Sequence, residues 1–347
     1  MDNLLDIENL EVRFFLKEGT VNAVNGVSLS VAPHRTLGVV GESGCGKSVT
    51  AKAAMRILPR QGKITAGAIW LRPRNGNNGT SRLDLTKQDP DGRVMRGIRG
   101  GDISMIFQEP MTSFSPVHTI GNQIGECVRL HQEADKRERK DRVVEMLRKV
   151  GVPMAERRFY AYPHELSGGL RQRCMIAMAL CCNPRLLIAD EPTTALDVTI
   201  QSQILDLIRR LQEDLGMAVM MITHDLGVIA ETADEVAVMY LGRVVEQSSA
   251  DAIFGEPLHP YTRGLLRSVP RIGKGNVARL AQIPGSVPNP FETVPGCPFH
   301  PRCERCIRRV CDTGAPPPFI ESKPGHKVAC HLYTTNQNQQ DGGGETQ

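Results

Sequence analysis

The sequence predicts an α/β fold in which helices cover both faces of a largely parallel sheet. The first observation is an alternation of apolar runs with helical segments in the second half of the chain. The apolar runs lie at 186–189, 218–222 and 236–240, and the helical segments at 199–215 and 226–232. The second observation is an apolar run at 37–40 that leads into a glycine-rich turn and then into a helix, from Ser48 to about Leu58. Such alternation is typical of parallel strands joined by crossover helices.

The first third of the chain adds strands of another kind. Residues 4–15 and 24–31 alternate apolar and polar side chains, which is typical of strands buried on one face only. Residues 72–82 (RPRNGNNGTSR) are polar and turn-forming, so we expect a long hairpin loop there. An apolar run at 103–107 predicts another strand.

A long helical stretch separates these strands from the second alternation. It runs from about Ile120 to Leu180, and its charged segment at 136–150 predicts a helix with one solvated face. We therefore expect a helical subdomain at about 110–180, between two groups of strands.

Composition excludes several classes of protein. With 347 residues, 40% of them hydrophobic and 23% charged, the chain can bury the core of a soluble globular protein. Aromatic residues make up only 4% and the net charge is only +4, which argues against a nucleic-acid surface. The N-terminus lacks a signal-peptide pattern, and no apolar run reaches the ~18 residues that span a bilayer. We therefore expect a cytosolic protein with reduced cysteines.

A phosphate-binding loop is the strongest motif. Residues 41–48 (GESGCGKS) match G-x-x-x-x-G-K-[ST] between a predicted strand and a predicted helix, which is the context this motif requires. Backbone N–H groups of such a loop wrap the phosphates, Lys47 places a charge between the β- and γ-phosphates, and Ser48 offers its hydroxyl to Mg²⁺. The residues expected to bind ATP here are Gly41, Glu42, Ser43, Gly44, Cys45, Gly46, Lys47, Ser48 and Val49.

A carboxylate pair completes this site. Residues 186–190 (LLIAD) form an apolar strand that ends in Asp190, and an acid at that position holds Mg²⁺ directly or through water. Glu191 follows at once, where it can orient or deprotonate the attacking water. The pair could also be an ordinary helix-start cap, but its combination with the phosphate-binding loop favours the catalytic interpretation.

Further motifs carry a family resemblance. The segment at 166–173 (LSGGLRQR) is similar to the signature motif of ABC-type ATPases, and it precedes the carboxylate pair as in that family. Gln108, the segment at 195–197 (ALD) and His224 resemble the family's Q-loop, D-loop and switch histidine. The resemblance covers residues 4–255. It implies the P-loop NTPase fold of an ABC-type nucleotide-binding domain, with a RecA-like core, an antiparallel β edge and a helical subdomain.

The resemblance also assigns roles to single residues. The implied catalytic residues are Glu191, His224, Lys47 and Gln108, and the implied Mg²⁺ ligands are Ser48, Gln108 and Asp190. Phe14 stands where the family places an aromatic ring that stacks on adenine. The implied contacts to ATP also include Ser167, Gly168, Gly169 and Asp197, with the signature completing the site of the opposite subunit. The fifth signature residue is Leu170 here instead of the usual glutamine.

ATPases of this family work as head-to-tail pairs on membrane transporters. We therefore expect a sister ATPase subunit in a heterodimer (a homodimer is the alternative), two transmembrane permease subunits and an extracytoplasmic solute-binding protein. The chain is expected at the cytoplasmic face of the inner membrane, with residues 109–113 at the entrance to the coupling surface. An alternative from another class is a soluble ABC ATPase that acts on ribosomes or nucleic acid. Such proteins carry tandem nucleotide domains or a long coiled-coil insertion, which this sequence lacks, so no nucleic-acid partner is expected.

Several segments narrow the resemblance to one group of importers. Those similar to the oligopeptide/dipeptide/nickel importer ATPases lie at 41–48, 111–113, 189–197 and 222–227. Residues 259–262 (HPYT) match the "HPY" C-terminal region of that group, whereas 114–116 (FSP) depart from its usual LNP. Peptides are then the leading cargo, with oligosaccharides or glycosides and nickel as alternatives.

The end of the chain is rich in cysteine. We expect a nucleotide-binding domain at 1–258, a C-terminal region at 259–333 and a disordered tail at 334–347. By resemblance, four thiolates hold a [4Fe–4S] cluster in a structural role, namely those of Cys297, Cys303, Cys311 and Cys330. Zinc is one alternative, and its candidate extra ligands are His300, His326 and His331. Free reduced thiols that bind no metal are the other alternative. Cys306 is extra to the four-cysteine pattern. Cys174, Cys181 and Cys182 follow an apolar helical pattern and are expected in the core.

Overall fold

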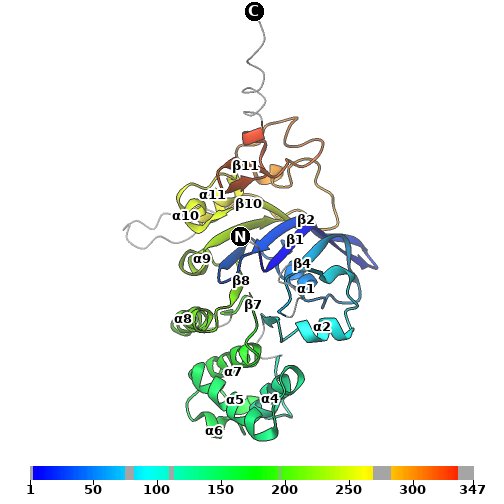
Figure 1. The fold of residues 1–347 in the computed structure, drawn as a ribbon. Helices are drawn as coiled ribbons and strands as arrows, with labels where there is room; N and C mark the ends of the chain where they lie inside the picture. The colour runs from blue at the N-terminus through cyan, green and yellow to red at the C-terminus, as the bar shows by residue number, and fades with distance from the viewer. Residues whose placement is uncertain (1–2, 75–81, 109–112, 195–196, 269–282, 335–347) are drawn as a thin grey trace, which may run out of the picture.

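Two sheets and a separate layer of helices make up the molecule in the computed structural model (Figure 1). The structure describes residues 3–74, 82–108, 113–194, 197–268 and 283–334. Within these ranges, no helix is both long and apolar enough to cross a bilayer. The helical layer lies at one end of the molecule, the C-terminal region at the other, and the sheets between them.

The larger sheet has eight strands in the order β11-β12-β10-β9-β3-β8-β7-β6. Five neighbours in this order are parallel: β9 (Glu235–Tyr240), β3 (Thr36–Val40), β8 (Ala218–Thr223), β7 (Leu186–Asp190) and β6 (Ile103–Ile106). Three antiparallel strands extend one edge: β10 (Arg243–Ser249), β12 (His326–Val328) and β11 (Ile320–Lys323). The predicted parallel core is confirmed, and the antiparallel edge includes residues from the end of the chain.

The smaller sheet is antiparallel and has the order β2-β1-β4-β5. Its strands are β1 (Leu5–Leu16), β2 (Gly19–Val31), β4 (Gly62–Leu71) and β5 (Leu83–Asp84). Trp70 pairs with Asp84 and Leu71 with Leu83, so the predicted hairpin at 72–82 is confirmed by its flanking strands, although 75–81 lie outside the described residues.

Helix α1 (Lys47–Ala54) packs between the two sheets. Its inner face carries Ala51, Ala53 and Ala54, all fully buried, and these small side chains let both sheets approach the helix. The prediction that this helix continues to about Leu58 is wrong. Arg56 adopts a positive φ of 54°, a left-handed conformation that cannot continue a right-handed helix.

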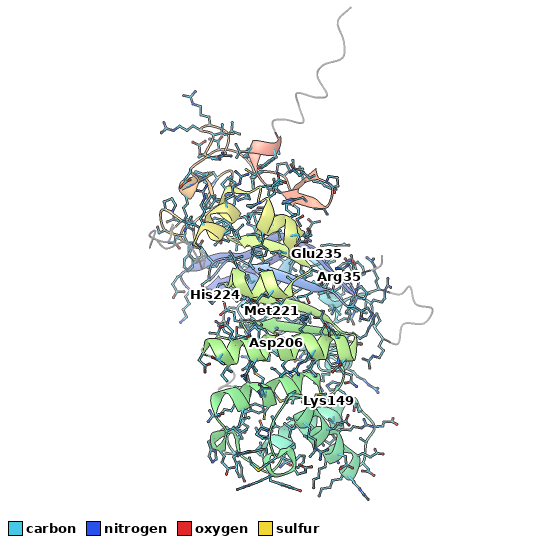
Figure 2. The ribbon with its side chains drawn as sticks, turned by 90° about the vertical axis from the view of Figure 1, so that its left-hand side faces the viewer. Arg35, Lys149, Asp206, Met221, His224 and Glu235 are labelled. Carbon is cyan, nitrogen blue, oxygen red and sulfur yellow. The ribbon has the colours of Figure 1, made fainter. Side chains whose placement is uncertain are left out.

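The predicted helical subdomain is present as α4 (Ile120–His131), α5 (Lys136–Lys149), a short α6 (Ala155–Arg158) and α7 (Gly168–Leu180). Helix α5 begins with a capping box, in which the Asp135 carboxylate accepts from the Glu138 N–H and the Glu138 carboxylate accepts from the Asp135 N–H. In Figure 2 the sheet strand with Met221 lies between this layer, marked by Lys149, and the C-terminal region beyond Glu235. The remaining helices are α2 (Arg93–Ile98), α8 (Val198–Leu215), α9 (Leu226–Thr232), α10 (Ala250–Gly255) and α11 (Pro260–Arg267).

The described residues of 259–333 pack onto the rest of the chain. Strand β12 pairs with β10 through Val328 and Glu246, and Phe299 is buried in the same core as Tyr240. The two parts share one sheet and one core, and the division at 258 stays a prediction. Of the predicted tail, residues 335–347 lie outside the described part.

Candidate nucleotide site

The phosphate-binding loop joins the end of β3 to the start of α1, as predicted. Its tight path depends on two glycines. A Cβ at Gly41 would lie 2.2 Å from the Met239 carbonyl oxygen, and one at Gly46, where φ is 101°, would lie 2.4 Å from the Ala23 carbonyl oxygen. Only glycine fits both positions, so the sequence makes a narrow loop of the kind that presents backbone N–H groups to an anion.

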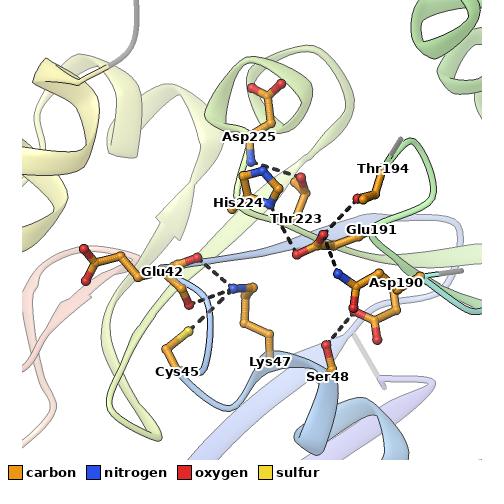
Figure 3. Close-up of polar contacts among 12 residues, drawn as sticks. Glu42, Cys45, Lys47, Ser48, Asp190, Glu191, Thr194, Thr223, His224 and Asp225 are labelled. Carbon is orange, nitrogen blue, oxygen red and sulfur yellow. Dashed lines mark hydrogen bonds and ion pairs between the residues drawn. The ribbon is translucent and has the colours of Figure 1, made fainter. Parts of the chain in front are cut away.

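Lys47 points into this loop from the first turn of α1. Its Nζ donates to the carbonyl oxygens of Gly41 (2.7 Å) and Glu42 (3.0 Å) and lies 3.7 Å from the Cys45 Sγ (Figure 3). Cys45 is buried, and burial raises the pKa of its thiol. The thiol is therefore a neutral neighbour of the Lys47 side chain and does not compete with phosphate for it.

Ser48 and Asp190 come from facing elements, α1 and the end of β7. The Ser48 hydroxyl donates to Asp190 Oδ1 at 2.8 Å. Asp190 is only 3% exposed, and this burial raises the pKa of its carboxyl group, although the hydrogen bond from Ser48 and two nearby lysines oppose the shift. Two of the three predicted Mg²⁺ ligands, Ser48 and Asp190, are thus adjacent. A hydroxyl and a carboxylate are the oxygen donors that Mg²⁺ prefers, so this pair fits the ion.

Glu191 sits on a strained turn directly after β7. Its φ is 49°, a left-handed conformation that is uncommon outside glycine and is often found at functional sites. Its N–H donates to the Ile222 carbonyl oxygen at 2.8 Å, which ties this turn to the end of β8. The left-handed turn and the hydrogen bond to Ile222 together place the Glu191 carboxylate in the space in front of the phosphate-binding loop (Figure 3).

The Glu191 carboxylate contacts three side chains, of which Thr194 and His224 are labelled in Figure 3. Thr194 Oγ1 donates to Oε2 at 2.8 Å, Gln108 Nε2 donates to the same oxygen at 3.0 Å, and His224 Nδ1 lies 3.2 Å from Oε1. Burial by itself would raise the pKa of Glu191, but the hydrogen bonds from Thr194 and His224 outweigh it and hold this pKa below its ordinary value. The carboxylate is therefore ionised and able to accept a proton.

The predicted signature segment starts helix α7. Ser167 is its N-cap and accepts from the Leu170 N–H at 3.4 Å, and both Ser167 and Gly168 are exposed. Leu170 is partly buried and packs against the core of the helical layer, so the residue that departs from the family pattern points to the core. The exposed serine and glycine are free of this packing and lie at a helix N-terminus, where backbone N–H groups attract anions.

The other residues predicted to contact ATP, Phe14 and Asp197, make their contacts outside the group of side chains around Glu191. Phe14 is half-buried on β1 and lies opposite Gly62 of β4, and Asp197 caps α8 by accepting from the Ile200 N–H at 2.9 Å. Their roles stay predictions. In the D-loop segment, 195–196 lie outside the described residues, as do 109–112 of the predicted coupling surface.

Sequence reasoning missed two residues that shape the site. Thr194 binds Glu191, and a hydroxyl three residues after that glutamate was a visible signal. Gln172 is buried on α7, and its Nε2 donates to the Pro192 carbonyl oxygen at 2.5 Å, which fastens the signature helix to the turn after Glu191. No local pattern indicates that contact, because the two positions meet only when α7 packs against the sheet at β6.

The predicted cysteine cluster lies away from these residues, in the C-terminal region. All ten cysteines are free, as expected for reduced thiols. The Cys330 thiol interacts electrostatically with those of Cys297, Cys303 and Cys311, so the four predicted ligands lie near one another. Burial raises the pKa of Cys297 to about 11 and that of Cys330 to about 12. Within the described ranges, no group of three or more His, Cys, Asp or Glu side chains is arranged to hold a single metal ion.

The core cysteines behave as predicted. Cys174 is fully buried within α7, and Cys181 and Cys182 are buried just past its end. Cys181 and Cys182 lie 3.7 Å apart at their Sγ atoms, in the core between α7 and α4. Burial raises the pKa of Cys174 to about 12, so this thiol is an unreactive part of the packing.

Comparison with known proteins identifies the class that this geometry defines. Residues 24–194 match the family described as "ABC transporter", and residues 245–311 match "Oligopeptide/dipeptide transporter, C-terminal region". The ATP-binding cassette MJ0796, solved as a dimer bound to ADP and Pi, has a TM-score of 0.61 at 25% identity over 71% of this chain and 98% of its own. The protein cbiO1 of Clostridium perfringens has a TM-score of 0.59 at 26% identity over 74% and 92%. The chain is therefore an ABC-type ATPase.

Curated relatives over nearly the full length narrow this class. The probable peptide ABC transporter ATP-binding protein of Sinorhizobium fredii is 51% identical over 95% of this chain and 95% of its own. The oligopeptide transport ATP-binding protein AppD of Bacillus subtilis is 48% identical over 96% and 98%. The dipeptide transport ATP-binding protein DppD of that organism is 48% identical over 96% and 95%. This chain belongs to the family of ATP-binding proteins of oligopeptide and dipeptide ABC transporters.

Proposed function

We propose that this chain is the ATP-hydrolysing subunit of a membrane importer for oligopeptides or dipeptides. The observation that carries the hydrolysis step is the carboxylate of Glu191, ionised and held by Gln108, Thr194 and His224 in front of the phosphate-binding loop. Family membership supports the importer role, and relatives named as peptide and dipeptide transport proteins support the cargo.

Each residue has a role in this proposal. Lys47 and the loop N–H groups bind the phosphates of ATP, and Ser48 with Asp190 holds Mg²⁺, which when bound neutralises charge on the phosphates. Glu191 accepts a proton from the attacking water. The water oxygen forms a bond to the γ-phosphorus, the bond to the bridging oxygen breaks, and ADP and phosphate result. His224 and Gln108 orient Glu191 through their hydrogen bonds with its carboxylate. In this proposal the same two side chains also respond to the γ-phosphate.

The signature segment is proposed to serve a second subunit. Ser167 and Gly168 are exposed at the N-terminus of α7, where a phosphate carried by a facing ATPase can reach them. The dimeric state of the solved cassette MJ0796 supports such a pair. Leu170 does not weaken this proposal, since its side chain packs on the core instead of pointing outward. The proposed partners are a sister ATPase, two permease subunits and an extracytoplasmic solute-binding protein, at the cytoplasmic face of the membrane.

Peptide uptake by the assembled transporter tests this function. The chain is co-expressed with the permease and receptor subunits encoded beside it, and uptake of a labelled dipeptide and tripeptide into membrane vesicles is measured with and without ATP. We expect ATP-dependent uptake of a peptide. Uptake of an oligosaccharide or of Ni²⁺ in place of peptides would contradict the cargo. Co-purification with ribosomes and without permeases would contradict the importer.

For the cysteine cluster we propose a [4Fe–4S] group held by Cys297, Cys303, Cys311 and Cys330 in a structural role. Four clustered thiols, three of them buried, support it by number and surroundings. Zinc held by the same thiolates with His300, His326 or His331 is the alternative. The cluster would fasten the loop between α11 and β11. Anaerobic purification followed by iron, sulfide and zinc assays tests this, and zinc without iron contradicts it.

A further inference from the structure

The C-terminal region holds one residue of the phosphate-binding loop at both its backbone and its side chain. The Glu42 N–H donates to the Tyr261 hydroxyl at 2.9 Å. The Glu42 carboxylate accepts from Arg302, with Nη1 at 2.7 Å from Oε2 and Nη2 at 3.0 Å from Oε1. Arg302 lies 260 positions further along the chain than Glu42 and directly precedes Cys303. Such a two-pronged pair fixes direction as well as distance.

Contacts other than the ion pair with Glu42 also fix the position of the Arg302 side chain. Its side chain is 4% exposed, its Nε donates to the Pro284 carbonyl oxygen at 3.1 Å, and its guanidinium lies over the Tyr240 ring at 5.9 Å. The hydrogen bonds that Arg302 donates to the Glu42 carboxylate raise the pKa of Arg302, so the guanidinium stays charged although it is buried. A buried charge in such a setting requires an ionic partner, and Glu42 supplies it.

Glu42 is also a neighbour of the nucleotide site. Its carbonyl oxygen accepts from the Lys47 Nζ at 3.0 Å, so its backbone borders the space for the phosphates. Its carboxylate points the other way, away from Lys47 (Figure 3). A carboxylate left unpaired at this position would repel the triphosphate and compete for Lys47, because like charges in a partly buried site interact strongly. The bond to Arg302 removes both effects.

We propose that Arg302 is a positioning residue for ATP: it neutralises Glu42 and keeps that carboxylate turned away from the phosphates, so that the cysteine-bearing segment sets the affinity of the phosphate-binding loop. The inference rests on ATP binding at this loop and deepens it. It assigns to the C-terminal region an effect on the nucleotide site, which lies in a different part of the sequence. The effect is electrostatic and acts through one carboxylate.

The prediction has a charge-specific test in the full chain. Affinity for the magnesium complex of a non-hydrolysable ATP analogue is measured by calorimetry for Arg302→Gln, Glu42→Gln and the double variant. We expect Arg302→Gln to weaken binding about tenfold, and we expect the double variant, which also removes the freed carboxylate, to recover most of the loss relative to Arg302→Gln. In steady-state assays Arg302→Gln raises KM for ATP and changes kcat much less. Arg302→Lys keeps the charge and is expected to retain most of the affinity.

Controls separate this effect from misfolding and from failure of the proposed function. Arg308→Gln removes a charge from an exposed position of the same segment and is expected to bind the analogue normally. If the double variant binds as weakly as Arg302→Gln, the electrostatic role is overturned and Arg302 only holds the segment in place. If Arg302→Gln binds normally, the inference is also overturned. Absence of binding by the unaltered chain would instead refute the nucleotide site itself.

Discussion

Two Glu–His pairs in the larger sheet use their charged groups in opposite ways. One pair lies at the carboxyl ends of the parallel strands, and the other lies at the antiparallel edge. At the carboxyl ends of the parallel strands, Glu191 is 11% exposed and its partner His224 is 59% exposed, so this pair stands open to an incoming ligand. At the antiparallel edge, Glu246 is fully buried and His326 is 4% exposed. The first arrangement can exchange partners during a reaction. The second holds the chain together, because a buried charge that loses its partner is strongly unfavourable.

Glu246 shows how the antiparallel edge is fastened. Its carboxylate accepts from the N–H groups of Leu258 (2.6 Å) and His259 (2.9 Å), and it lies 2.7 Å from His326 Nε2. One side chain on β10 therefore joins the start of α11 to strand β12. The comparison teaches that similar residue types, a glutamate with a histidine, form a reactive site at one edge and a structural clamp at the other.

The largest expected effect tests the open side of the comparison. Glu191→Gln removes the proton acceptor and keeps the side-chain shape, so we expect ATP turnover to fall by about 10²- to 10⁴-fold while ATP binding persists. Steady-state phosphate release and calorimetric ATP binding measure the two effects. Glu213→Gln, at an exposed position of α8, is the matched control and should leave turnover unchanged. Near-normal hydrolysis by Glu191→Gln would show that this residue is not the base.

The clamp predicts a loss of stability instead. Glu246→Gln keeps the shape but leaves one of its N–H partners facing an amide N–H₂, so we expect the free energy of unfolding to fall by about 2–4 kcal/mol. Chemical denaturation measures the loss, and hydrogen exchange should locate it at β10, α11 and β12. Glu304→Gln, whose carboxylate is 70% exposed, is the control. If Glu246→Gln were as stable as the unaltered chain, Glu246 would not be a structural clamp, and the contrast with the Glu191–His224 pair would be wrong.

Burial of His259 makes the C-terminal edge sensitive to acid. Burial lowers the pKa of His259 to about 3, while an unfolded histidine has a pKa of about 6.5. Below about pH 6.5 the unfolded chain binds a proton at His259 that the folded chain does not bind. The free energy of unfolding therefore decreases as the pH decreases, by about 2 kcal/mol at pH 5.

Asparagine at this position can still cap α11, where the His259 Nδ1 now accepts from the Tyr261 N–H at 3.0 Å. Denaturation of His259→Asn between pH 7 and pH 5 should therefore show a smaller pH slope than that of the unaltered chain. His164→Asn, at an exposed position, is the control. Equal slopes for the unaltered chain and His259→Asn would mean that His259 is protonated in the folded state.

The smallest expected effect links the two regions. Cys303 directly follows the short turn His300–Arg302, so we expect a change at Cys303 to shift Arg302. We expect Cys303→Ser to weaken binding of the ATP analogue by about threefold, and by less in a Glu42→Gln background. Cys306→Ser, at a neighbouring cysteine outside the four-cysteine pattern, is the matched control. A loss of affinity that persists without the Glu42 carboxylate would point to a general disturbance of the fold.

Much of the nucleotide site was predictable because its residues are close in sequence to the elements that position them. Lys47 and Ser48 begin the helix after β3, and Asp190 and Glu191 end and follow β7. A strand followed by a turn places such side chains at one edge of a parallel sheet, whatever the rest of the chain does. The error at the end of α1 was of another kind. The residues after Ala54 have helical propensity, but Arg56 turns left-handed.

The sequence by itself determined the class of fold, the phosphate-binding loop, the carboxylate pair and the family, since short motifs and apolar periodicity encode them locally. Tertiary structure alone decided which distant residues meet. The contacts of Glu42 with Arg302 and of Glu246 with His326 span 260 and 80 positions, and no local pattern selects them. The Glu246–His326 contact forms because β12 adds to the sheet beside β10, and the Glu42–Arg302 contact forms because the turn His300–Arg302 packs against Tyr240. In both places a buried charge requires a counterpart nearby in space.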